Sequence, residues 1–277
     1  MSEFYHHLNT GVYKGSIQQQ LFEFSNIILN TSELVICNKR YYVRETEAYF
    51  YSTTIHQDPY MNTNYQKPVT WNFYHDRDNG KYKIGIMFGD SDSESNYGNM
   101  LIRSIYDIKE MKLIEGPYNV VDEIITGYSL DDFMCRLARR TGGNTISVTG
   151  SNTLKLIPSK KARDDEILAS PRVGLTLNRG ILHHEDEFIM RPYRFTTYTD
   201  ELKEMKATLF ISAYLNAKAN NIKNPFYETI SKLKVGNRIA RNWIKSFEEG
   251  KKIDHNSFIG HNLSTSDILK MYGRLHT

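Results

Sequence analysis

Two glutamates and a tyrosine occupy every second position of one short segment, and these residue types could perform chemistry together. Glu45, Glu47 and Tyr49 are separated by single residues within Val-Arg-Glu-Thr-Glu-Ala-Tyr-Phe, residues 43–50. The valine, tyrosine and phenylalanine of this segment are typical of a β-strand, and residues two apart on a strand share one face. A carboxylate beside an aromatic ring could hold a planar ligand and activate a water molecule next to it. The alternative is a solvated edge strand, where charged residues are common.

A helix and a series of strands are predicted to position this segment. Residues 14–30 show an amphipathic helical pattern, with Ser16 as a possible N-cap. Asn79-Gly80 is a strong hairpin signal, and Gly116-Pro117 begins a further helix because proline suits the first helical turn. The predicted strands are 33–37 and 41–50, joined by a turn at Asn38-Lys39, and then 69–75, 81–88 and 98–106.

The C-terminal part of the chain differs from the rest in both pattern and charge. Residues 199–277 contain 13 Lys and Arg and 8 Asp and Glu, a net charge of +5, whereas the remaining residues contain 22 basic and 24 acidic side chains. We therefore predict an α+β domain at 1–198 and a helical, basic extension at 199–277 that suits a polyanion. The predicted elements after residue 125 are helices at 131–140, 200–221, 225–248 and 264–275, and a charged loop at 160–166.

Composition excludes several other classes of protein. The 277 residues contain two cysteines, too few for a disulfide framework or a CxxC metal motif. The first residues form no signal peptide, and no run of about 18 apolar residues predicts a membrane span. The adjacent histidine pairs His6-His7 and His183-His184 point apart, so neither predicts a metal site. We therefore expect a cytoplasmic protein without metal or other cofactor.

Five short motifs, taken in their order along the chain, resemble those of the alkyladenine (3-methyladenine) DNA glycosylase family. The resemblance covers roughly residues 12–198 and implies a compact domain around a curved antiparallel sheet. The motifs are Glu-Thr-Glu-Ala-Tyr at 45–49, Leu-Ile-Arg at 101–103, Gly-Pro at 116–117, Ser-Pro-Arg-Val-Gly at 170–174 and Arg-Pro-Tyr-Arg-Phe at 191–195.

The resemblance implies roles for the residues of the first motif and its surroundings. Glu47 matches the family's general base, which activates the water that attacks the sugar, whereas Glu45 has a supporting role. Tyr49 matches the tyrosine that stacks on a flipped base, and His56 the histidine on the other side of that base. Each has a structural alternative: an exposed carboxylate for Glu47 and a core position for Tyr49. Trp71 and Phe73 are expected to replace the second aromatic platform of the pocket.

Other parts of the chain either support this function or depart from the family. Arg172 matches a family arginine near the catalytic water, and Arg103 one near the DNA backbone; for each, an ion pair is the alternative. Asp76 occupies the position where the family has a tyrosine that wedges into the duplex, so Tyr74 is the substitute wedge that we consider. The loop at 51–68 lacks the family's Arg- and Asn-rich segment, which leaves the identity of the base open.

The basic extension has no counterpart in the resemblance. Its segment 232–245 combines basic residues with a tryptophan and could lie along DNA phosphates through Arg238, Arg241 and Lys245. It could equally be a solvated helix face, with Ile239 and Trp243 packing on the domain.

These observations predict a monofunctional DNA glycosylase of base-excision repair that acts on double-stranded DNA. It flips a modified base, hydrolyses its N-glycosidic bond and leaves an abasic site, because no lysine is placed to act as a Schiff-base nucleophile. The expected substrate is an alkylated or deaminated purine, or a different or bulkier modified base in foreign or phage DNA. The rival hypotheses are a non-catalytic DNA-binding module with the same fold and an interaction protein that assembles through its helical tail.

Overall fold

The computed structural model describes residues 16–61, 67–76, 80–90, 95–125, 147–148, 153–177, 184–197 and 200–276. Their contacts divide the chain into two units. The first comprises residues up to Gln57 and from Met61 to Glu166, and the second comprises Asp58–Tyr60 and the chain from Ile167 onward. The boundary expected from the sequence, between residues 198 and 199, lies about thirty residues further along the chain than this division.

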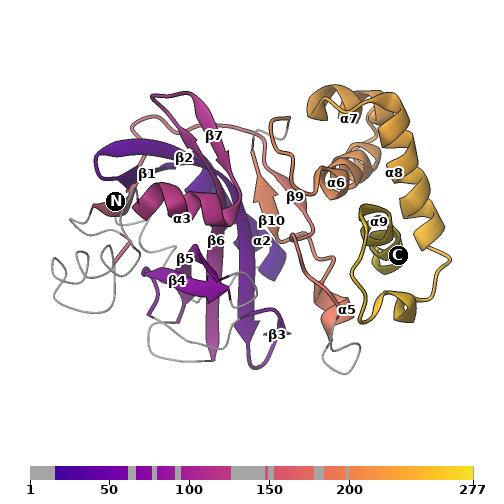
Figure 1. Ribbon diagram of the computed structural model, residues 1–277, viewed down its shortest axis with the longest axis horizontal. Coiled ribbons are helices and arrows are strands. Elements are labelled where there is room, and N and C mark those ends of the chain that lie inside the picture. Colours follow the sequence, from indigo (N-terminus) through magenta and orange to yellow (C-terminus); the bar gives the residue numbers. More distant parts are fainter. Residues whose placement is uncertain are drawn as a thin grey trace. The chain divides into compact units, whose positions relative to one another are not determined.

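The first unit is built on a large, open, antiparallel sheet, and the predicted α+β class is confirmed. The strand order is β4-β5-β6-β2-β1-β8, and the short strands β3 and β7 pair with β2 and β6 (Figure 1). Strand β2 is therefore central in this order, not a solvated edge. The strands are β1 (Ser32–Ile36), β2 (Lys39–Ser52), β3 (His56–Gln57), β4 (Trp71–Asp76), β5 (Lys81–Gly89), β6 (Asn96–Asp107), β7 (Lys112–Glu115) and β8 (Leu154–Pro158).

The first hairpin follows directly from local sequence. Ile36 pairs with Lys39, so Cys37 and Asn38 form a two-residue connection, one position earlier than predicted. Both residues have positive φ, 46° and 75°, as the favoured two-residue hairpin turns require. The second predicted hairpin is also present, since β4 and β5 pair on either side of Gly80.

Two helices cover opposite faces of this sheet. Helix α2 (Ile17–Asn30) begins at Ser16, whose side chain accepts a hydrogen bond from the Gln19 amide, as predicted. Its Ser25 hydroxyl contacts Met100 and Thr46 on one face of the sheet. Helix α3 (Pro117–Ile125) lies on the other face (Figure 1), where the Tyr118 hydroxyl donates a hydrogen bond to Asp76. The predicted helix start at Gly116-Pro117 is confirmed.

The second unit combines a short two-stranded ladder with helices. Strand β9 (Leu168–Ser170) pairs antiparallel with β10 (Arg194–Thr196), and the charged segment 160–166 before β9 is loop, as predicted. Fully buried side chains of this unit include Phe195, Phe210 and Phe247. The helices are α5 (Glu185–Phe188), α6 (Lys206–Ala219), α7 (Pro225–Leu233), α8 (Asn237–Gly250), the 3-10 helix η2 (His255–Phe258) and α9 (Thr265–Leu275).

Prediction of a single helix at 225–248 was wrong, because the segment forms two helices. Lys234 adopts the left-handed conformation, with φ at 49°, and its amide bonds to the Ile230 carbonyl, which ends α7. Gly236 has extended backbone and precedes α8. The helical periodicity of the sequence continues across this break, so the pattern alone does not reveal it. The helix predicted at 200–221 begins later, at Lys206, after Met205 in a left-handed conformation.

One prediction, the helix at 131–140, falls outside the described residues. Among the described helices, none has the length and apolar character needed to cross a bilayer.

Candidate functional site

The glutamates of the central strand lie inside the molecule. Glu45 and Glu47 have no exposed surface, so the alternative of solvated carboxylates does not apply. The pairing of β2 with β6 is irregular beside them: Val43 pairs with Ile105 and Glu45 with Ser104, which leaves Arg44 as an extra residue on β2. A second shift follows at once, because Thr46 pairs with Ile102 and Arg103 is an extra residue on β6. Regular pairing resumes at Thr46, and the contacts of Arg103 with both carboxylates place Glu45 and Glu47 on one face, which alternation extends to Tyr49, as predicted.

Arg103 connects the two glutamates. Its Nε donates a hydrogen bond to Glu45 Oε1 at 3.0 Å, and its Nη1 lies 3.4 Å from Glu47 Oε2. The Ser104 hydroxyl donates to the second oxygen of Glu45 at 2.5 Å. Two carboxylates therefore share one guanidinium, and these three side chains together carry one more negative than positive charge. The predicted contact of Arg103 with DNA phosphates is incompatible with this position, because the residue is only 4% exposed; its ion-pair alternative is what the structure has.

Tyr49 is held against Glu47 by its hydroxyl group. The hydroxyl donates a hydrogen bond to Glu47 Oε2 at 3.0 Å, so the same carboxylate oxygen receives Tyr49 and Arg103. The ring packs against a small cluster formed by Met61, Met87 and Tyr97. Tyr49 thus contacts Glu47 directly, packs partly against this cluster and leaves part of its surface exposed; its role as a stacking residue stays a prediction.

The sheet register shows which other side chains share this face. A row of directly paired residues crosses four strands, and paired residues point to the same side of a sheet. The row consists of Asn72, Gly85, Leu101 and Glu47. Two further residues point to the same side as Glu47: Asn99, which pairs with Tyr49, and Tyr74, which lies two residues along β4 from Asn72.

Asn72 and Asn99 were missed by reasoning from the sequence. Asn99 is 5% exposed, and its Oδ1 accepts no hydrogen bond from any described residue. A buried acceptor without a donor is costly unless a ligand or water supplies one. The amide lies over Gly85, where a Cβ atom would approach Asn99 Oδ1 to 2.0 Å. Its sequence signal is a polar residue inside the apolar strand at 97–102.

Tyr74 faces the glutamate cluster rather than projecting as a wedge. Burial raises the pKa of its hydroxyl, the negative charge of Glu47 raises it further, and Arg103 opposes this effect. The hydroxyl is therefore protonated and able to donate a hydrogen bond over the whole physiological range. Asp76, at the position expected for a wedge, is tied to Lys83 at 2.8 Å and to the Tyr118 hydroxyl at 2.5 Å.

Three predicted pocket residues lie on the opposite face. Trp71 pairs with Ile86, which pairs with Met100, and Met100 contacts Ser25 of α2. Phe73, two residues further along β4, points to that side as well. His56 pairs with Ser52 and its ring lies 5.5 Å from Phe50, which alternation places on the face away from Glu47. The structure therefore does not bring Trp71, Phe73 or His56 together with Tyr49.

Arg172 belongs to the second unit, where it forms a closed ion pair. Its Nη1 and Nη2 donate to the two oxygens of Asp58 at 2.6 and 3.3 Å, and neither side chain has exposed surface. Nη2 also donates to the Phe188 carbonyl. The guanidinium lies 5.4 Å from the Tyr60 ring centre and 5.5 Å from that of Tyr193. This arrangement accounts for Arg172 as a structural ion pair, the alternative that the sequence left open.

The basic residues proposed for the extension are exposed along α8. Arg238, Arg241 and Lys245 are all on the surface, and Arg241 lies over the Phe226 ring at 4.9 Å. Trp243 packs 5.7 Å from Phe210, as expected, whereas Ile239 is 51% exposed and does not pack as predicted.

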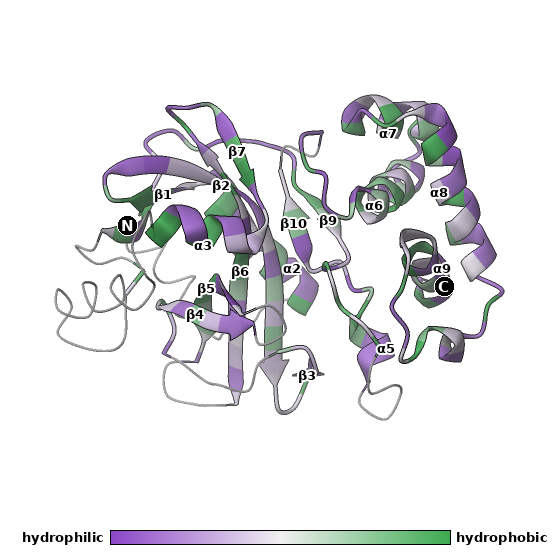
Figure 2. Ribbon diagram, in the orientation of Figure 1, coloured by the Kyte–Doolittle hydropathy of each residue, from purple (hydrophilic) through white to green (hydrophobic). Residues whose placement is uncertain are grey.

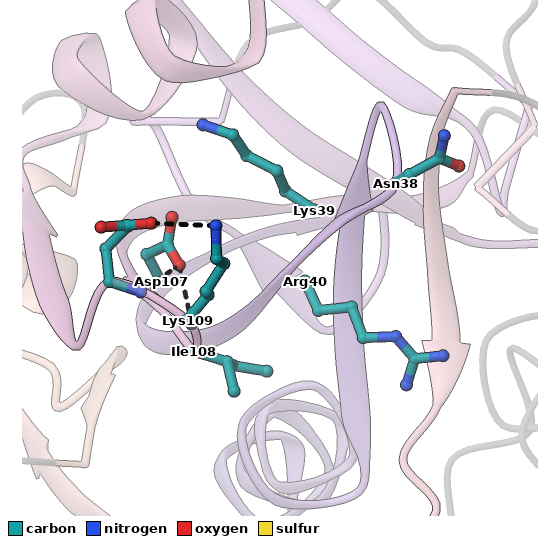
Figure 3. A pocket seen from close by; sticks show the side chains of 7 residues that line it. Asn38, Lys39, Arg40, Asp107, Ile108 and Lys109 are labelled. Carbon is teal, nitrogen blue, oxygen red and sulfur yellow. Dashed lines mark hydrogen bonds and ion pairs between the residues drawn. The ribbon is translucent and has the colours of Figure 1, made fainter.

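A cavity of about 330 Å³ is present at the turn between β1 and β2, away from the predicted site residues. Its charged side chains are engaged locally: Lys39 pairs with Glu123, and Asp107 accepts hydrogen bonds from the Lys109 and Glu110 amides. Lys39 and Arg40 extend in different directions from the turn (Figure 3). This cavity therefore does not present a set of convergent groups. No cluster of metal-ligating side chains is found among the described residues.

Comparison with known proteins identifies one distant relative of this chain. It is similar to the uncharacterized protein L759 of Acanthamoeba polyphaga mimivirus, with 25% identity over 209 residues. The similarity spans 68% of this chain and 90% of the mimivirus protein. No family model matches the chain, and no solved structure matches it.

Proposed function

We propose that the protein is a monofunctional DNA glycosylase, which hydrolyses the bond between a modified base and deoxyribose and leaves an abasic site. The proposal depends mainly on the position and contacts of Glu47. It occupies the glutamate position of the motif at 45–49, is fully buried on a central strand, and is held in place by Arg103 and the Tyr49 hydroxyl. A fixed carboxylate in a dry site is suited both to accept a proton and to stabilise a cation.

In the proposed reaction, Glu47 accepts a proton from a water molecule while the water oxygen bonds to the sugar C1′. The bond between C1′ and the base nitrogen breaks, its electrons leave with the base, and the base takes a proton from solvent. The sugar passes through an oxocarbenium-like state, as in glycoside hydrolysis. The negative charge of the nearby Glu47 carboxylate stabilises that developing positive charge.

The groups that surround Glu47 suit a planar base. Enzymes that act on a base in duplex DNA must extrude it into a pocket. Tyr49 and Tyr74 provide aromatic surface on the face that carries Glu47, and Asn99 provides a buried acceptor for an N–H donor of the base. We propose an alkylated or deaminated purine as the substrate, with a different or bulkier modified base as the second class.

Burial of Glu47 sets a condition on this function. Because the side chain has no exposed surface, a base can reach it only if neighbouring side chains move as the base enters. Tyr49 and Tyr74 lie on the same face and are only partly buried, so these are the side chains that we propose to move.

The same burial supports a second candidate, a non-catalytic DNA-binding module. An acid that is wholly enclosed and paired with an arginine is also what a structural ion pair requires. Under this candidate Glu47 stabilises the sheet and performs no chemistry.

A base-release assay separates the two candidates. Duplexes that each carry one modified base, covering alkylated purines, deaminated purines and bulkier modifications, are incubated with the full-length protein and heated in alkali to cleave abasic sites. We expect release from at least one duplex, and Glu47→Gln to lower its rate by about 10²- to 10⁴-fold.

Glu33→Gln is a matched control. Glu33 is also buried on a strand, at 6% exposure, and is held by Arg40 at 2.9 Å and by the Ser159 hydroxyl at 2.9 Å. We expect this variant to retain base release. Equal rates for wild type and Glu47→Gln contradict the assigned role, and absence of release from every duplex favours the binding module.

A further inference from the structure

The helices α7 and α8 form a compact pair with a three-residue connection. Helix α7 ends at Leu233, residues 234–236 form the turn, and α8 begins at Asn237. Lys234 adopts the left-handed conformation, the buried Val235 anchors the turn, and the Val235 amide bonds to the Ile230 carbonyl. Two helices joined by a turn of three or four residues that contains glycine are the pattern of a helix-turn-helix.

Helix α6 packs against both α7 and α8. Its Phe210 ring lies 6.5 Å from Phe226 of α7 and 5.7 Å from Trp243 of α8. Leu233 and Ala240, on either side of the turn, are fully buried. The angle between α7 and α8 is therefore fixed by a shared apolar core, as it is in three-helix DNA-binding domains.

Helix α9 packs against the C-terminal half of α8. A Cβ atom on Gly273 would lie 1.8 Å from the Phe247 carbonyl oxygen, and one on Gly250 would lie 1.9 Å from the Lys270 carbonyl oxygen, so the two backbones are in close contact. This contact lies toward the end of α8, and on the first two turns of the helix Arg238, Ile239, Arg241 and Asn242 are exposed.

The exposed face of α8 carries basic and amide side chains. Arg238, Arg241, Asn242 and Lys245 are exposed, and their spacing of three, four and seven residues places them on one side of the helix. Residues 232–245 contain five basic side chains and no acidic one. Figure 2 shows α8 as predominantly hydrophilic, yet Ile239 remains 51% exposed beside this face.

We propose that α6, α7 and α8 form a helix-turn-helix module that inserts α8 into the major groove of double-stranded DNA and reads its sequence. Arginine recognises guanine and asparagine recognises adenine through paired hydrogen bonds in that groove, and an apolar side chain contacts the thymine methyl group. Arg238 and Asn242 are the base-reading candidates, Ile239 is the methyl contact, and Lys245 binds phosphate. The module acts independently of Glu47 and does not rest on base excision.

The arrangement of Arg241 is consistent with this use. Its guanidinium carbon lies 4.9 Å from the centre of the Phe226 ring of α7, a cation–π contact that restrains the side chain. Arg241 is nevertheless exposed, so its N–H donors stay accessible to a base or a phosphate.

The proposal is tested by DNA binding of the full-length protein. Selection from duplexes with a randomised centre is expected to enrich a defined sequence, and fluorescence anisotropy then measures affinity for that sequence and for a scrambled duplex. We expect Arg238→Gln and Asn242→Ala each to weaken binding to the selected duplex by about tenfold, with little change for the scrambled one. Lys245→Gln weakens binding to both and reduces the dependence on salt.

Lys252→Gln is the matched control, because this exposed lysine lies just beyond the end of α8. It removes one positive charge without altering the proposed reading face, and we expect unchanged affinity. Circular dichroism confirms that each variant is folded. Selection that enriches no sequence, an equal loss in Arg238→Gln and Lys252→Gln, or tighter binding to single-stranded RNA than to the duplex would each overturn the proposal. Each of these measurements is independent of base release.

Discussion

Two buried acid–arginine groups, one in each unit, differ in how their charges are balanced. In the second unit, Asp58 and Arg172 form a one-to-one pair through two hydrogen bonds, with neither side chain exposed. In the first unit, Glu45 and Glu47 share Arg103. Both groups are equally remote from solvent, so burial alone does not distinguish a structural carboxylate from one placed for chemistry.

The difference lies in how many carboxylates each of these arginines contacts. Asp58 receives two donors from one guanidinium, and the rings of Tyr60 and Tyr193 enclose the pair. Burial raises the pKa of both tyrosine hydroxyls, which shows how dry this surrounding is. Glu45, Glu47 and Arg103 taken together instead carry one more negative than positive formal charge, and the Tyr49 and Ser104 hydroxyls donate hydrogen bonds to the two carboxylates. That imbalance is costly in a resting protein and useful to a reaction that develops positive charge.

Removal of the arginine from the closed pair is the strongest test of this comparison. Arg172→Met leaves Asp58 buried without its partner, and breaking a buried pair in this way costs about 3–5 kcal/mol of unfolding free energy. Urea unfolding measures the loss. The double variant Asp58→Asn with Arg172→Met is expected to recover part of the stability, since it removes the uncompensated charge. If Arg172→Met is as stable as wild type, the Asp58–Arg172 ion pair does not stabilise the fold.

The shared cluster is expected to respond less strongly. Glu45→Gln removes the surplus charge but leaves Arg103 with Glu47, and it weakens the charged hydrogen bonds from Arg103 and Ser104 by about 1–3 kcal/mol in total. Because Glu47 can still accept the proton, base release by the folded variant is expected to fall through the lost negative charge, but by less than for Glu47→Gln. Equal loss of activity in the two variants would mean that both carboxylates take part in the reaction.

Local features of the fold were predictable because local sequence determines them. Ser16 caps α2, Pro117 begins α3 and strands β4 and β5 form a hairpin, since each depends on a few adjacent residues. The shared face of Glu45, Glu47 and Tyr49 also follows from the alternation of a single strand. These are the parts of the fold and of the candidate site on which sequence reasoning was correct.

The remaining parts depend on pairings between distant residues. Whether Phe73 or Tyr74 faces Glu47 is set by the register of four successive strands, and a shift of one residue reverses every side chain. The pairing of Arg172 with Asp58 joins positions 114 residues apart, which no local pattern specifies. The break between α7 and α8 was missed for a different reason: Lys234 takes a left-handed conformation without the glycine that usually marks it.

Asp267, a carboxylate near the surface, is expected to contribute less to stability than the buried carboxylates. Asp267 and Ser264 form a capping box at the start of α9, and the hydrogen bond from the Ser264 hydroxyl lowers the pKa of Asp267. Because the pKa is lower in the folded state, the interaction stabilises the protein above the unfolded pKa, near 4, and this contribution is lost as the pH falls through the folded value. We expect Asp267→Asn to cost about 0.5–1 kcal/mol at pH 7. The difference from wild type should diminish below pH 4 in urea unfolding; a difference that grows at low pH would contradict this sign.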